Sequence, residues 1–73
     1  MLNGIFVLQQ SSRFFIHELY TDVLSNKFAS NNLTVGDEVI KINQFYCEHV
    51  GNIAKYIATT PIRYLHKIGR AHV

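Results

Sequence analysis

Short hydrophobic runs separated by turn-forming residues set the pattern of this chain. Residues 4–8 (GIFVL) are a β-branched and aromatic run of the type found in strands, and residues 9–12 (QQSS) are a polar turn. Residues 13–20 form a second run, whose side chains alternate between two faces. Two such runs joined by a short polar turn predict a β-hairpin.

Beyond the hairpin, the pattern predicts a short helix followed by two strands. Asp22 is predicted to be the N-cap of a helix at residues 23–29, which the two asparagines that follow would stop. Gly36 supplies the turn that leads into an apolar strand at residues 39–42. A very short strand is expected at residues 45–46.

The strongest helical signal lies at residues 48–58. Apolar side chains recur there at helical spacing, at Val50, Ile53, Ala54 and Ile57. Pro61 ends the helix because it cannot continue the hydrogen-bond ladder. Residues 62–66 read as the last strand.

This order of elements predicts an α+β fold: a small, partly open β-barrel or sandwich capped by two helices. The chain has 73 residues, which fits one domain and leaves no room for a second. Its residues are 48% hydrophobic, with five Phe and four Tyr, and disordered segments are poor in those types.

Charge and cysteine content narrow the class of partner and the compartment. The net charge of +2 is small and its basic residues are spread along the chain, which argues against nucleic acid or an anionic membrane as partner. Cys47 is the single cysteine, which favours a reducing compartment. The longest apolar run, residues 5–8, is too short for a membrane span or a secretory signal, so we expect a cytoplasmic protein.

The residues do not form a pattern that predicts catalysis or metal binding. Cys47 and His49 are two positions apart, and residues at that spacing on a helix do not face each other. The four histidines and the cysteine lack the spacing of metal ligands. We therefore expect a protein that is not an enzyme and uses no cofactor and no metal.

One segment resembles a known family. Residues 33–43 (LTVGDEVIKIN) are similar to the most recognisable segment of PDZ domains, in which Gly-Asp-Glu precedes an apolar strand and an Asn. Upstream, residues 15–19 resemble the family's third strand and residues 22–27 its first helix. Downstream, residues 53–57 fall at its second helix and residues 61–66 at its last strand. The resemblance implies a PDZ-like domain over residues 1–68.

In that family, the C-terminal peptide of a partner adds as an antiparallel strand in the groove between the second strand and the second helix. A Gly-apolar-Gly-apolar loop before the second strand holds the peptide's carboxylate with backbone N–H groups. Residues 2–5 match that loop only at Gly4 and Ile5. The resemblance implies that the strand side of the site is made by Asn3, Gly4, Ile5, Phe6 and Val7.

On the helix side, the family presents the first, fifth and eighth residues of its second helix, which are Val50, Ala54 and Ile57 here. A small residue at Ala54 beside Ile57 leaves room for a large terminal side chain. Many members begin this helix with a histidine that binds a Ser or Thr hydroxyl of the peptide. His49 lies one position before the aligned site, and Val50 at that site favours an apolar peptide residue instead.

The ends of the chain differ from the family pattern. The family's first strand is missing before residue 2, so we expect a fragment truncated at its N-terminus. Residues 67–73 resemble translated sequencing-adapter DNA, and we expect residues 69–73 to be an unstructured tail. Two alternatives to peptide binding stay open: a structural α+β domain without a ligand, and the PDZ fragment of a protease.

Overall fold

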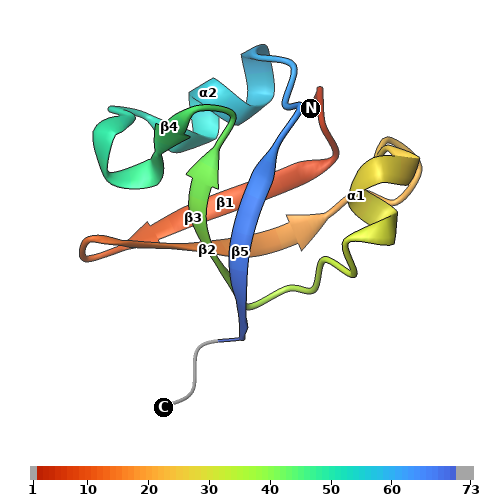
Figure 1. Cartoon of the computed structure of the whole chain (residues 1–73), viewed down its shortest axis with the longest axis horizontal. Helices are drawn as coiled ribbons and strands as arrows, with labels where there is room; N and C mark the ends of the chain where they lie inside the picture. The colour runs from red at the N-terminus through yellow and green to blue at the C-terminus, as the bar shows by residue number, and fades with distance from the viewer. Residues whose placement is uncertain (1, 71–73) are drawn as a thin grey trace.

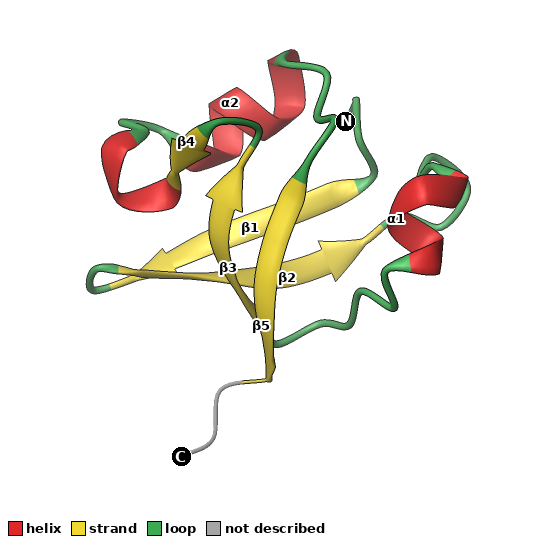
Figure 2. Cartoon of the chain, viewed as in Figure 1, coloured by secondary structure: helices red, strands yellow, loops and turns green. Residues whose placement is uncertain are grey.

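The computed structural model describes residues 2–70 of the chain. Five strands form an antiparallel sheet, and two helices and one 3-10 turn accompany it (Figures 1 and 2). In chain order the elements are β1 (Ile5–Gln10), β2 (Arg13–Leu19), α1 (Asn26–Ser30), β3 (Asp37–Ile42), β4 (Phe45–Tyr46), η1 (Cys47–His49), α2 (Ile53–Thr59) and β5 (Leu65–Arg70). The coarse fold class, α+β with an antiparallel sheet and two helices, is confirmed, and the sheet does not close into a barrel.

The predicted hairpin is present, and its strands are longer than the hydrophobic pattern suggests. β1 continues through both glutamines, so that Gln10 pairs with Arg13 across a turn of only two residues, Ser11 and Ser12. Ser11 adopts a φ of 57°, the left-handed conformation that tight hairpin turns require. The polar residues of β1 are exposed. The hydrophobic run in the sequence therefore ends before the strand does.

The first helix begins later than predicted. Its N-cap is Ser25, whose hydroxyl accepts a hydrogen bond from the backbone N–H of Phe28 at 3.4 Å, and not Asp22. Phe28 is the one residue of α1 that is buried, and it anchors the helix to the core. A helix of five residues is held mainly by such tertiary contacts, so local capping signals cannot fix its start.

β3 is the central strand of the sheet. It pairs with β2 at Glu38, with β5 from Asp37 to Ile42, and with β4 at its end (Figure 1). The turn before it follows the expectation for Gly36, which has a φ of 98°. The carboxylate of Asp37 accepts a hydrogen bond from the backbone N–H of Thr34 at 2.9 Å. Asp37 is buried and also forms an ion pair with Lys67 of β5 at 3.2 Å.

The last strand lies three residues beyond its predicted start. β5 begins at Leu65, whereas Ile62 is a buried residue of the preceding loop. The strand continues to Arg70, which pairs with Asp37, so the predicted tail boundary at residue 69 is corrected: Gly69 and Arg70 belong to β5. Backbone pairing needs no apolar side chains, which is why the sequence pattern does not reveal it. Residues 71–73 of the predicted tail lie outside the described residues.

The core is one cluster between the sheet and the helices. Its hydrophobic side chains come from nearly every element, and they are Ile5, Val7, Phe14, Ile16, Phe28, Val39, Ile42, Cys47, Ile53, Ile57, Ile62 and Leu65. No helix within residues 2–70 is both long and apolar enough to cross a membrane.

Candidate functional site

β1 is an edge strand that lies beside α2. It pairs with β2 on one side, and α2 packs against it (Figure 1). Between the two elements is a depression of about 290 Å³, hereafter the β1–α2 groove. It is lined by Val7, Leu8 and Gln9 of β1 and by Gly51, Asn52, Ile53 and Ala54.

The register of the hairpin decides which backbone groups of β1 face away from β2. Gln10 and Arg13 flank a two-residue turn and therefore form a hydrogen-bonded pair. Hydrogen-bonded and non-hydrogen-bonded pairs alternate along antiparallel strands, so Leu8 bonds to Phe15 of β2. The backbone N–H and C=O groups of Val7 and Gln9 consequently point outward, on the open edge of β1.

The helix that borders the groove is shorter than predicted. α2 begins at Ile53 and not at residue 48, because Asn52 acts as its N-cap: the Asn52 Oδ1 accepts a hydrogen bond from the backbone N–H of Lys55 at 3.1 Å. Residues Cys47–His49 form a separate 3-10 turn, and Gly51 separates that turn from α2. The apolar spacing around Val50 is therefore not evidence of one continuous helix.

Two predicted site residues lie before this shorter helix and do not line the groove. His49 is exposed, and its ring lies 6.3 Å from that of Tyr46. Its imidazole Nε2 lies 3.7 Å from a carboxylate oxygen of Glu48. Val50 is half-buried and borders a different depression, on the side of α2 that carries Lys55.

The other two helix residues of the predicted site have different positions. Ala54 is half-buried and lines the β1–α2 groove, as expected for a small pocket residue. Ile57 is only 1% exposed and belongs to the hydrophobic core. The structure therefore brings Ala54, but not Ile57, to the groove surface.

The predicted residues of β1 also divide between core and surface. Ile5 and Val7 are buried, so they are available to a ligand mainly through their backbone. Phe6 is half-buried on the opposite face of the strand, where its ring lies 5.9 Å from that of His17. Its side chain faces away from the core residues on either side of it, as alternation along a strand requires.

Gly4, at the start of β1, is held in a conformation that only glycine adopts easily. Its φ is 74°, and a Cβ there would lie 2.7 Å from the backbone N of Leu24 and 2.8 Å from the carbonyl oxygen of Tyr20. Its own carbonyl oxygen accepts a hydrogen bond from the backbone N–H of Tyr20 at 2.8 Å. Because Gly4 has no side chain, the backbone before β1 can pack directly against the backbone of Tyr20 and Leu24.

Asn3 fastens the same loop to the end of α2. Its side-chain Nδ2 donates to the carbonyl oxygens of Ile57, at 2.6 Å, and Thr60, at 2.9 Å. Its Oδ1 accepts from the backbone N–H of Ile62 at 3.1 Å. Both amide hydrogens are therefore engaged within the protein, and Asn3 positions the loop instead of presenting its amide to a ligand.

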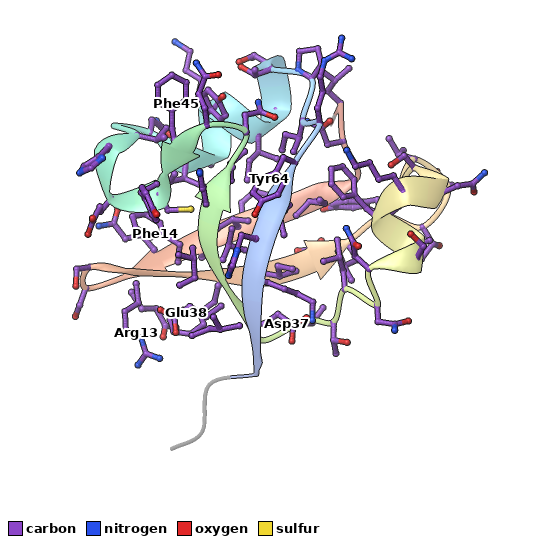
Figure 3. The ribbon with its side chains drawn as sticks, in the orientation of Figure 1. Arg13, Phe14, Asp37, Glu38, Phe45 and Tyr64 are labelled. Carbon is purple, nitrogen blue, oxygen red and sulfur yellow. The ribbon has the colours of Figure 1, made fainter. Side chains whose placement is uncertain are left out.

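Ionisable groups with shifted pKa values lie away from the groove. The Arg13 guanidinium makes two hydrogen bonds to Glu38, of 2.7 and 3.1 Å, and holds the pKa of that carboxyl below its ordinary range (Figure 3). Burial raises the pKa of the Cys47 thiol to about 11, so the thiol is protonated at neutral pH. Within residues 2–70, the side chains do not bring three or more His, Cys, Asp or Glu residues together as a metal site.

Sequence reasoning missed most of the groove. The lining residues that were not among the predicted site residues are Leu8, Gln9, Gly51, Asn52 and Ile53. One local signal was available: Gly51 and Asn52 stand directly before an apolar residue, and an Asn in that place is typical of an N-cap. That reading would have started the helix at Ile53 and moved the aligned positions accordingly.

Comparisons with known proteins identify no relative of this chain. No protein-family model matches the chain, and neither a curated protein nor a solved structure is significantly similar to it.

Proposed function

We propose that this chain is a PDZ-like interaction module, which binds the C-terminal peptide of a partner protein by β-strand addition in the β1–α2 groove. The observation that carries the proposal is the open edge of β1 beside α2. An extended peptide gains affinity at such an edge from main-chain hydrogen bonds, and specificity from pockets for alternate side chains.

Val7 and Gln9 make the main-chain hydrogen bonds to the peptide. Their outward N–H and C=O groups offer two donors and two acceptors to an added strand, at the spacing of an antiparallel ladder. Leu8, between them, is 38% exposed and lines the groove. The peptide thus pairs with the backbone of β1 while its side chains meet the apolar surface of Leu8 and Ala54.

The direction of the peptide follows from the antiparallel pairing. Its C-terminus lies at the start of β1, beside Gly4 and Ile5. Because the Asn3 side chain is engaged by the carbonyl oxygens of α2, backbone N–H groups of this loop are the donors for the carboxylate. Ala54 leaves space in the groove for an apolar side chain of the peptide.

A library of labelled peptides with random C-terminal residues tests the proposal by fluorescence polarisation. Selected sequences should bind with a free carboxylate and lose at least about tenfold in affinity when the same peptide is amidated, because a charge-assisted contact is lost. If the library shows no preferred terminal sequence, the chain is a structural α+β domain and the proposal is wrong.

A pair of tryptophan variants in α2 locates the binding surface. Ala54→Trp fills the β1–α2 groove and should abolish binding of the selected peptide, with a circular dichroism spectrum close to wild type. Lys55→Trp is the matched control, since Lys55 is exposed on another face of the same helix. Equal loss of binding in the two variants would place the peptide elsewhere.

A further inference from the structure

A second and larger groove lies on the other side of α2. Its volume is about 430 Å³. Three aromatic rings line it, those of Phe45, Tyr56 and Tyr64, together with Asn43, Pro61 and Arg63. We call it the aromatic groove.

The aromatic groove is separate from the β1–α2 groove. Tyr56 lines the former and Ala54 the latter, and two residues along an α-helix are about 200° apart around its axis. Occupation of one groove therefore leaves the other open.

Asn43 holds the walls of the aromatic groove in place. Its Nδ2 donates to the hydroxyl of Tyr56 at 3.1 Å and to the carbonyl oxygen of Pro61 at 3.3 Å. Its Oδ1 accepts from the backbone N–H of Arg63 at 2.8 Å. The ring of Phe45 meets that of Tyr56 edge-on, with 6.5 Å between centroids. A groove ordered in advance costs less entropy to occupy.

The rings of this surface are unusually open to solvent. Phe45 is 45% exposed and Tyr64 47% exposed, and the neighbouring Tyr46 is 49% exposed. Figure 3 places Phe45 at the β4 end of the molecule and Tyr64 at the approach to β5. Contiguous exposed apolar surface of this kind typically marks an interaction site.

The lining of the aromatic groove is positively charged. Among the described residues that line the groove, Arg63 is a cation and none carries a carboxylate. Lys41 adds a second cation: its Nζ lies 5.3 Å from the ring centroid of Tyr46 and 5.8 Å from that of Tyr64. Charge complementarity therefore selects an anionic partner.

We infer that the aromatic groove binds an acidic, proline-containing segment of a partner protein in the polyproline II conformation. Proline-rich segments dock in aromatic-lined grooves because their extended helix is already ordered, and Arg63 is placed to pair with a carboxylate of such a segment. A single-stranded nucleic acid needs a basic track that follows several phosphates. Two cations, Lys41 and Arg63, fit a short acidic peptide better.

Titration of the full chain with an acetylated and amidated peptide of sequence PPEPPE tests this inference. The blocked C-terminus keeps the probe from depending on carboxylate capture in the β1–α2 groove, so its result is independent of the proposed function. Binding should shift the backbone amide NMR signals of Phe45, Arg63 and Tyr64 and leave those of β1 unchanged. Shifts confined to β1, or none at millimolar peptide, would overturn the inference.

Two variants test the chemistry of the groove. Tyr64→Ala should weaken PPEPPE about tenfold, while Tyr20→Ala, at an exposed tyrosine beyond the end of β2, leaves it unchanged. Arg63→Glu should weaken PPEPPE at least about threefold and strengthen binding of PPKPPK instead. Equal binding of the two peptides by the wild type would refute the charge selection, and tighter binding of an oligouridine would make nucleic acid the ligand.

Discussion

The side-chain amide of Asn3 donates a hydrogen bond of 2.6 Å to the carbonyl oxygen of Ile57, 54 positions away in the sequence. This contact joins the loop before β1 to the last turn of α2, and therefore connects the two sides of the β1–α2 groove. The backbone carbonyl groups in the last turn of a helix lack hydrogen-bond partners within the helix, and the Asn3 side chain is such a partner for the carbonyl of Ile57.

Replacing Asn3 by Ala should lower the free energy of unfolding by about 1–3 kcal/mol, because the partly buried groups of Ile57, Thr60 and Ile62 lose their partner. A urea titration followed by circular dichroism measures the change. Gln44→Ala, which removes an exposed amide from a turn, serves as the control and should change stability by less than ~0.5 kcal/mol. Equal stabilities for the two variants would mean that Asn3 does not hold the loop.

Gly4 and Gly51 offer a matched pair of glycine substitutions. Gly4→Ala should destabilise the fold by at least ~2 kcal/mol, because φ is 74° and the new methyl group meets backbone atoms of Tyr20 and Leu24. Gly51→Ala meets nothing within 4 Å and should be neutral, or stabilise by up to ~1 kcal/mol through the unfolded state. Thermal melts of both variants would contradict this account if Gly4→Ala melted at the wild-type temperature.

Stability should fall in acid partly through Glu38. Hydrogen bonding from Arg13 lowers the pKa of Glu38 in the folded state below its ordinary 4.5, so the unfolded chain binds a proton first as pH falls. The contribution of this pair is therefore present above the ordinary pKa and is lost as pH decreases through the folded value. Glu38→Gln should make unfolding less dependent on pH below about 5. Urea titrations of the wild type and of Glu38→Gln at a series of pH values measure this difference. If both proteins lose the same stability as pH falls, Glu38 does not contribute to the acid dependence.

Cys47 should be almost inert in the folded protein. Burial raises the pKa of its thiol from an ordinary 9.0 to about 11, which lowers the thiolate fraction near pH 8 about a hundredfold. A chromogenic disulfide reagent should therefore react slowly in buffer and rapidly in denaturant. Since the folded pKa is raised, stability is complete below the unfolded pKa and declines as pH rises toward the folded one. Equal rates in buffer and denaturant would show that the thiol is accessible.

The sequence by itself determined the kinds of element and their order. Alternation of side chains predicted the hairpin, the Gly36–Asp37 turn predicted the entry to β3, and Pro61 predicted the end of the second helix region. These features depend on backbone and side-chain preferences within a few residues, so a local pattern contains them. Ala54 was expected in the site from the resemblance to PDZ domains and not from this pattern; in the structure it lines the β1–α2 groove.

Tertiary structure alone decided where the elements begin and which residues share a surface. β5 continues to Arg70 because β3 offers backbone partners, and its polar side chains give no apolar signal. Ile57 and Ala54 lie on one apolar stripe, yet packing buries one and leaves the other at the groove. The aromatic groove unites side chains from the β3–β4 turn, α2 and the loop before β5. Such contacts depend on how distant segments pack, and no local pattern records that.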